Sequence, residues 1–196
     1  PGLIRFVESS SIEGDLKAFE RQQLLQGVTT ILVPFDSGGG VSLDQEIERF
    51  QEKNPVLNYG WLVSLKDLEK TAKIEQATIL GDALFQGAIG VVGTVASLQN
   101  CHDLVPRIMK WMNRDCFDQE KLLAFKSWPQ RISDQEWQGT FKLASRLGAH
   151  ERGSIRIGDF ADIVLYRRQD HSFDNPIASE PSLIFVNGHI RSQISR

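Results

Sequence analysis

Residues 15–35 read DLKAFERQQLLQGVTTILVPF, and this stretch decides the fold class. Its first half, residues 15–26, places leucine and phenylalanine at helical spacing among charged and glutamine residues. Gly27 follows at the point where such a helix is expected to end. The second half, residues 28–35, is a β-branched, apolar run that is typical of a buried strand. A helix followed directly by a buried strand predicts a β/α unit.

The same alternation extends on both sides of this stretch, as far as Ser97. We predict strands at 3–7, 28–35, 56–65 and 88–95, helices at 15–26 and 42–53, and one or two helices at 68–85. Ser42 is the expected N-cap of the second helix, and Gln45 would complete a capping box. Alternating strands and helices predict an α/β fold with a parallel sheet.

Beyond Ser97 the pattern changes. Helices are predicted at 104–112, 119–125 and 133–147, and strands at 154–157, 161–166, 182–186 and 189–194. The Asn187-Gly188 pair between the last two strands is a strong hairpin signal. We therefore predict two domains: a partial (β/α) TIM-type barrel over residues 1–148 and a small β-sandwich-like region over residues 149–196.

Composition narrows the classes of partner. The chain has 196 residues, of which 24% are charged, and a net charge of -3. Because its densest basic cluster is Arg167-Arg168, we expect neither nucleic acid nor an anionic membrane as partner. Its apolar runs are far shorter than the roughly 20 residues that span a bilayer, and it opens without a signal-peptide pattern, so we expect a cytoplasmic location. Cys101 and Cys116 are expected to be free thiols.

Five segments together resemble the amidohydrolase superfamily. They are PGLIRFVES at 1–9, QGVTTILV at 26–33, GDALFQGAIG at 81–90, LGAHERGSIRIGDFADIVL at 147–165 and IFVNGHI at 184–190. The nearest branches are the N-acyl-D-amino-acid deacylases and the dihydroorotase-like enzymes. The resemblance implies a (β/α)8 barrel with a small β-sandwich beside it. It also implies hydrolysis of C–N bonds in amides or cyclic amides with one or two zinc ions.

The opening strand departs from the family at its metal ligands. The family pattern is P-G-L-I-D-x-H-x-H, in which both histidines bind the catalytic metal. Here Arg5 replaces the aspartate, and Val7 and Ser9 stand in place of the two histidines. Neither valine nor serine offers the imidazole nitrogen that zinc favours. The opening therefore keeps the form of the family's strand without its chemistry.

Further features of the chain also oppose a metal centre. A full barrel of this type takes about 250 residues, so strands five to eight have no room here. The four histidines, which are His102, His150, His171 and His189, form no H-x-H or H-x3-H pair. Without three converging ligands, zinc cannot generate a hydroxide near neutral pH. We therefore expect no cofactor and a structural or partner-binding role.

An alternative stays open: an incomplete or fragmentary copy of an active, zinc-dependent hydrolase of C–N bonds. The start at Pro1 and the absent strands favour this alternative, whereas the loss of both histidines opposes it. Whether the chain is an enzyme is therefore undecided by its sequence.

If chemistry survives, it is expected at the carboxyl ends of the strands. Those positions hold Glu8, Ser9, Asp36, Ser37, Ser64, Lys66 and Thr94. Glu8 and Asp36 could act as an acid–base pair, and Lys66 could neutralise an anionic ligand. The run Gly38-Gly39-Gly40 between a strand and a helix is a candidate anion-binding loop. A small-molecule amide is the ligand class that the resemblance implies.

Open sheet edges indicate a protein partner. A half barrel has two unpaired edges, and a sandwich that lacks strands has another. The four tryptophans, Trp61, Trp111, Trp128 and Trp137, are candidate interface residues, although core packing is their commoner fate. We therefore expect a homo-oligomer or a complex with another protein.

Overall fold

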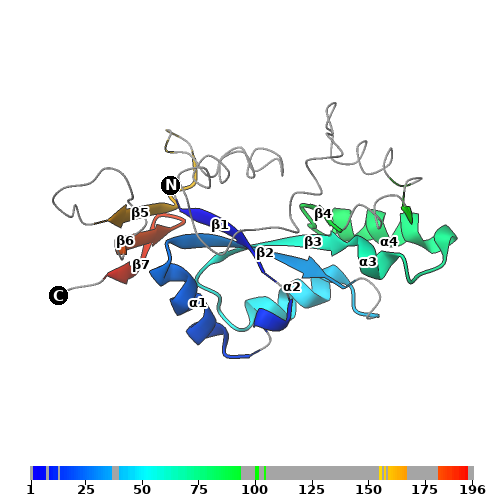
Figure 1. Ribbon diagram of the computed structural model, residues 1–196, viewed down its shortest axis with the longest axis horizontal. Coiled ribbons are helices and arrows are strands. Elements are labelled where there is room, and N and C mark those ends of the chain that lie inside the picture. The colour runs from blue at the N-terminus through cyan, green and yellow to red at the C-terminus, as the bar shows by residue number, and fades with distance from the viewer. Residues whose placement is uncertain are drawn as a thin grey trace. The chain divides into compact units, whose positions relative to one another are not determined.

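The computed structural model describes residues 2–7, 9–12, 14–36, 40–93, 100, 101, 104, 155, 157, 159–166 and 181–193. Its elements are β1 (Leu3–Phe6), η1 (Ser9–Ile12), α1 (Leu16–Leu25), β2 (Val28–Phe35), α2 (Leu43–Gln51), β3 (Asn58–Ser64), α3 (Leu65–Leu68), α4 (Lys73–Phe85), β4 (Gly90–Val92), β5 (Ile163–Tyr166), β6 (Pro181–Val186) and β7 (His189–Gln193) (Figure 1). The helices predicted at 119–125 and 133–147, most of that at 104–112, and the predicted boundary after residue 148 lie outside the described residues.

The predicted α/β class is confirmed. Strands β1 to β4 form one sheet in the order β1-β2-β3-β4, and the pairs β1–β2 and β3–β4 are parallel. Helices separate the strands along the chain, as β/α units require. Within the predicted strand at 88–95, the structure pairs Gly90–Val92 with β3, and residues 94 and 95 lie outside the described residues.

The segment 15–35, which comprises α1 and β2, folds as its sequence predicts. Asp15 is the N-cap of α1, and its side chain accepts a hydrogen bond from the Ala18 N–H at 3.1 Å. Gly27 ends the helix with a φ of 75°, which lies in the left-handed region that glycine adopts readily. Seven of the eight residues of β2 are buried, consistent with a strand covered on both faces.

The capping box predicted for α2 is wrong. Ser42 occupies the N-cap position, but its side chain makes no capping hydrogen bond. The Gln45 N–H donates instead to Asp44 Oδ1 at 2.9 Å, and the Leu43 N–H donates to Gln86 Oε1 at 3.0 Å. Two amides in the first turn of α2 are therefore bound by Asp44 and Gln86 rather than by the Ser42 hydroxyl.

The chain divides into two compact units. The first comprises Pro1–Leu32, Pro55–Tyr59 and Pro129–Arg196, and the second comprises Val33–Asn54 and Gly60–Trp128. In the first, the buried side chains include Leu3, Leu24, Val28, Ile31, Leu57, Val164, Ile184 and Val186. In the second they include Val33, Leu43, Phe50, Trp61, Leu62, Leu65, Leu68, Leu80 and Val91. Each unit thus has an apolar core of its own.

The second unit places Trp61 in its core. The indole is 7% exposed and meets the Phe50 ring edge to face, with centroids 5.6 Å apart. Trp61 is therefore a packing residue rather than an interface residue. The other three tryptophans lie outside the described residues.

Residues 163–193 supply a separate antiparallel sheet in the order β5-β6-β7 (Figure 1). Asn187 and Gly188 form the predicted turn between β6 and β7, with φ values of 51° and 77°. Positive φ at both positions is the signature of a type I′ hairpin turn. Of the strand predicted at 154–157, only Ile155 and Ile157 are described. Neither residue belongs to a strand, and both side chains are exposed.

None of the helices within the described ranges has the length and apolar character that a membrane crossing needs.

Candidate functional site

The carboxyl ends of β2 and β3 carry three of the predicted candidates. Asp36 directly follows β2 and is exposed. Ser64 ends β3, is 8% exposed, and caps α3 by accepting a hydrogen bond from the Asp67 N–H at 3.4 Å. Lys66 lies in α3 and is exposed. The structure therefore brings these polar groups to one strand-end cluster of the second unit.

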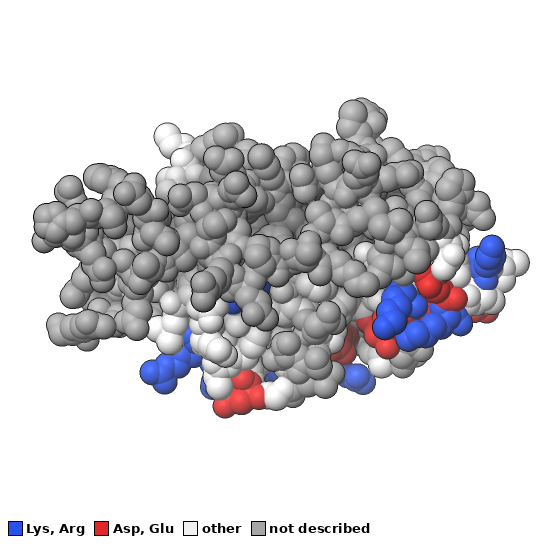
Figure 2. All heavy atoms as spheres, viewed as in Figure 1, with Lys and Arg blue, Asp and Glu red and all other residues white. Residues whose placement is uncertain are grey.

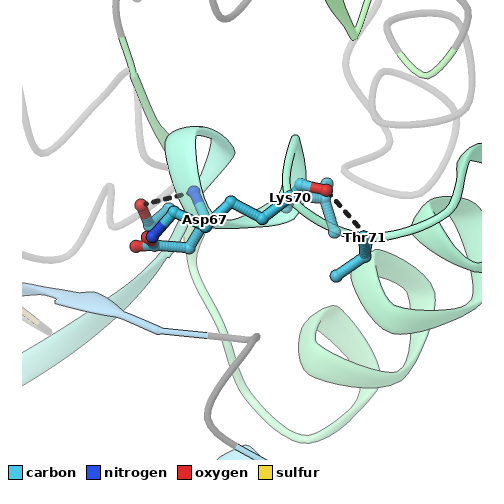
Figure 3. A network of polar contacts seen from close by, with 5 residues as sticks. Asp67, Lys70 and Thr71 are labelled. Carbon is cyan, nitrogen blue, oxygen red and sulfur yellow. Dashed lines mark hydrogen bonds and ion pairs between the residues drawn. The ribbon is translucent and has the colours of Figure 1, made fainter.

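The centre of this cluster is an ion pair that the sequence analysis missed. Lys70 Nζ lies 2.5 Å from Asp67 Oδ1, one helical turn away, and Figure 3 shows the two side chains in contact. The Asp67 side chain is 19% exposed and that of Lys70 is 64% exposed. Nearby, the Thr71 hydroxyl donates to the Leu68 carbonyl at 2.7 Å. Both polar contacts are local to the turn after β3.

Electrostatics of the pair favour its charged form. Burial raises the pKa of Asp67, but the hydrogen bonds from Lys70 and Ser64 outweigh this effect and lower it below its ordinary value. The hydrogen bond to Asp67 raises the pKa of Lys70, and the charge of Asp36 adds to the effect. Because the carboxylate and the ammonium neutralise one another, neither is poised for acid–base catalysis near neutral pH.

Most of the other candidates that the sequence places at strand ends lie outside the described residues. Glu8, Ser37, Gly38, Gly39 and Thr94 lie outside the described residues, so the proposed pairing of Glu8 with Asp36 stays a prediction. Ser9 begins η1 and is partly exposed. Gly40 has a φ of 72°, and a Cβ built there would meet nothing within 4 Å. Gly40 thus has a left-handed backbone, which glycine adopts readily.

The first strand shows what replaces the expected metal ligands. The Val7 N–H donates to the Leu32 carbonyl at 2.9 Å, which extends the pairing of β1, but its side chain offers no donor atom. Arg5 Nη1 instead donates to the side-chain oxygens of Gln23 and Gln26, at 2.8 and 2.5 Å. Within the described ranges, no group of three or more His, Cys, Asp or Glu side chains could hold a metal ion. Val7 and Ser9 thus offer none of the nitrogen, thiolate or carboxylate donors that catalytic zinc takes.

Cys101 is a buried free thiol in the second unit. Burial raises the pKa of Cys101, and the nearby charge of Glu69 raises it further. A thiol whose pKa is raised carries little thiolate, which is the nucleophilic form. Cys101 is therefore inert packing, and its neighbour His102 lies outside the described residues.

Segments distant in sequence meet in the first unit at a junction defined by Gly2, Gly27 and Asp162. The Gly2 N–H donates to the Asp162 carbonyl at 2.8 Å, and the Leu3 N–H donates to the Gly27 carbonyl at 2.9 Å. A Cβ at Gly2 would overlap the side chain of Thr29. A Cβ at Gly27 would overlap the hydroxyl of Tyr166. Packing of the Thr29 and Tyr166 side chains thus favours glycine at these two positions, and the positive φ of Gly27 favours it further.

Side chains close this junction through a group that we call the clasp: Asn58, Asp162 and Asn187. Asp162 is 4% exposed and accepts from Asn58 Nδ2 at 3.1 and 3.0 Å and from the Asn187 N–H at 2.9 Å. Asn187 Nδ2 in turn donates to Asn58 Oδ1 at 2.6 Å. The buried carboxylate therefore accepts hydrogen bonds from neutral amide donors of two other segments.

A second buried carboxylate anchors the segment that precedes β3. Glu20 lies on α1 and is 1% exposed, and its Oε1 accepts from the Val56 and Leu57 N–H groups at 2.9 and 3.1 Å. The same oxygen accepts from the Tyr59 hydroxyl at 3.1 Å. Burial, and then the Glu20 charge, raise the pKa of Tyr59 well above its ordinary value. Glu20 therefore ties residues 56–59 to α1.

The sequence indicated only some of the residues that form these two buried carboxylate groups. Asp162 and Asn187 stand inside the two closing segments that carry the family resemblance, yet nothing there indicated that they bond to each other. Glu20 reads as one more polar residue of an amphipathic helix, and Asn58 as an ordinary strand residue. The one sequence feature that indicated a buried Glu20 is its position on the apolar face of the helix, four residues from both Leu16 and Leu24.

The visible charges are mixed in sign. In Figure 2, Lys and Arg side chains lie next to Asp and Glu side chains on the described part of the surface.

Comparison of the whole chain with protein-family models finds no match, and comparisons with curated proteins and with solved structures find none either.

Proposed function

We propose that this chain is an amidohydrolase-like protein that lacks the metal-ligand set and acts as a structural or partner-binding homologue. One observation carries the proposal: the segments that resemble the family meet in space. Gly2, Gly27, Asp162 and Asn187 come from four of those segments and lie within one hydrogen-bonded junction. Their common role is to join backbone segments, which is a scaffold role that survives without catalysis.

The chemistry of the first strand supports the same proposal. Val7 and Ser9 occupy the places of the two histidine ligands, and the partly buried Arg5 is engaged by glutamines of α1. Zinc in catalytic sites takes histidine nitrogen, cysteine sulfur or carboxylate oxygen, and neither Val7 nor Ser9 supplies one of these. On the basis of the family resemblance, the parallel sheet is proposed to be part of a partial TIM-type barrel.

Metal content and hydrolysis test the proposal together. The full chain, purified without chelator, is assayed for zinc by elemental analysis and for hydrolysis of N-acetyl-D-amino acids and dihydroorotate with added zinc. We expect no stoichiometric zinc and no turnover. The matched variant Val7→His/Ser9→His restores two nitrogen donors and should take up more zinc than the wild type. Stoichiometric zinc in the wild type, or turnover that a chelator abolishes, would instead support the alternative of an active metal-dependent hydrolase.

The partner-binding role is proposed to operate through strand edges. Among the described strands, β1 and β4 end one sheet and β5 and β7 end the other. Ile190 on β7 is 58% exposed, so an apolar side chain is presented beside that edge. Exposed edges with apolar side chains pair readily with a second strand. A second copy of this chain is the first partner to test.

Light scattering after size exclusion measures this assembly. We expect the wild type to exceed the monomer mass of 22.1 kDa at the higher concentrations. Ile190→Lys should return the mass toward the monomer, because a charge beside an edge blocks pairing. Ile74→Lys is the control, since Ile74 is 87% exposed on α4 and belongs to no strand. A wild type that stays monomeric throughout would overturn self-association.

A further inference from the structure

Asn187 of the clasp belongs to a chemically reactive dipeptide, Asn187-Gly188. In an Asn-Gly sequence, the glycine backbone nitrogen can attack the asparagine side-chain carbonyl carbon, because glycine has no Cβ to obstruct the approach. Asn187 and Gly188 form this sequence at the tip of the β6–β7 hairpin, and both are exposed. Water and hydroxide therefore have access to the dipeptide.

We propose that Asn187-Gly188 is a site of spontaneous deamidation that the clasp controls. A base removes the proton of the Gly188 N–H, and this nitrogen forms a bond to Asn187 Cγ. The Cγ–Nδ2 bond breaks and ammonia leaves, which closes a succinimide ring. Water then opens the ring at either carbonyl and yields aspartate or isoaspartate. Water is the only co-reactant, and nothing is oxidised or reduced.

The folded clasp opposes each step. The Gly188 N–H donates to the Ala161 carbonyl at 3.0 Å, so the attacking nitrogen keeps its proton and its position. Asn187 Nδ2 is held by Asn58 Oδ1 at 2.6 Å, and the Asn187 N–H is held by Asp162 Oδ1 at 2.9 Å. The amide cannot turn toward Gly188 until these bonds open. The rate of deamidation therefore reports how often the clasp opens.

The product would oppose closing of the clasp. The Asn58 amide has one carbonyl and one NH2 group, which now serve Asn187 and Asp162 respectively. An aspartate at position 187 accepts but does not donate, so Asn58 Oδ1 would lose its donor and would face a carboxylate oxygen instead. The new carboxylate would also face that of Asp162, and like charges at short range repel. Deamidation is thus a one-way release of the β6–β7 hairpin.

Peptide mass spectrometry of the full chain, incubated at mildly alkaline pH, tests the control by the clasp. We expect the native chain to deamidate at Asn187 about tenfold or more slowly than the urea-unfolded chain, because opening must come first. Asn58→Ala should raise the native rate, whereas Arg21→Ala on the exposed face of α1 should not. Equal rates in the native and unfolded wild type, or a folded Asn58→Ala variant that reacts at the native rate, would overturn the proposal.

Two further measurements complete the test. If Asn58→Ala does not fold, the deamidation rate of the wild type is followed in urea below the unfolding transition, where it should rise as the clasp opens locally. A deamidation rate that is independent of urea contradicts the proposal. For the product, Asn187→Asp is compared with Asn187→Gly, which keeps the positive φ and adds no charge. We expect the larger fall in melting temperature for Asn187→Asp, and an equal or smaller fall would refute the one-way release.

Discussion

Glu20 and Leu57, which are 37 positions apart in the chain, are joined by a buried hydrogen bond of 3.1 Å from the Leu57 N–H to Glu20 Oε1. The same oxygen also serves Val56 and Tyr59. A carboxylate that is 1% exposed is stable in this position because three donors converge on it. The loop before β3 therefore depends on one side chain of α1.

Replacing Glu20 tests this dependence. Glu20→Ala leaves two amides and a hydroxyl without their acceptor, and we expect the free energy of unfolding to fall by about 2–4 kcal/mol. Glu20→Gln keeps a carbonyl oxygen and should lose about half as much. Urea unfolding measures both, with Lys17→Ala on the exposed side of α1 as the control. Equal losses for alanine and glutamine would show that the charge, and not the acceptor geometry, stabilises the loop.

The two tyrosines should resist ionisation. Burial and the Glu20 charge raise the pKa of Tyr59, and burial raises the pKa of Tyr166. A raised pKa in the folded state stabilises the fold below the ordinary tyrosine value, about 10, and this contribution disappears as the pH rises beyond it. We expect phenolate absorbance to appear together with loss of the circular dichroism signal. Ionisation of both tyrosines near pH 10 in the folded chain would contradict this.

Gly27 should tolerate no side chain. Its φ of 75° is strained for alanine, and the Tyr166 hydroxyl occupies the place of a Cβ. We expect Gly27→Ala to lower the free energy of unfolding by about 2–3 kcal/mol. Adding Tyr166→Phe removes the overlapping oxygen, so the double variant should recover about 1 kcal/mol of the loss, measured as a double-mutant cycle. Strict additivity would show that the hydroxyl is not the obstacle.

The Asp67–Lys70 pair predicts a shifted titration. The pKa of Asp67 should lie below its ordinary value of 3.8, as followed by the side-chain carbon shift in NMR. Because the folded pKa is lowered, the carboxylate stabilises the fold above pH 3.8, and this contribution is lost as the pH falls through the folded value. Lys70→Ala should move the midpoint upward, and Lys53→Ala should leave it unchanged. A midpoint that Lys70→Ala does not move would remove the ion pair as the cause.

Local sequence predicted most of the first half of the fold. Periodicity placed α1, β2 and α2 within two residues of their observed ends, and Gly27 and Asn187-Gly188 marked a helix end and a hairpin turn. These features depend on residues at most a few positions apart, so the sequence pattern contains them. The capping of α2 was not predictable, since its acceptor Gln86 is 43 positions away.

The candidate site was predictable in part. Asp36, Ser64 and Lys66 were placed at strand ends because parallel strands bring their carboxyl ends to one edge. The ion pair beside them depends on the short helix α3 (Leu65–Leu68), which lies between the strand predicted at 56–65 and the one or two helices predicted at 68–85 and was not predicted. Lys70 was therefore assigned to helix rather than to the site.

The sequence by itself determined the order of helices and strands, the turns that need glycine, and the absence of histidines from the first strand. Only the tertiary structure decided which polar groups meet. Asn58 reaches Asp162 across 104 positions and Asn187 across 129. Spacing along the chain has no bearing on such pairs, because a buried polar group is satisfied by whichever donor the packing brings to it.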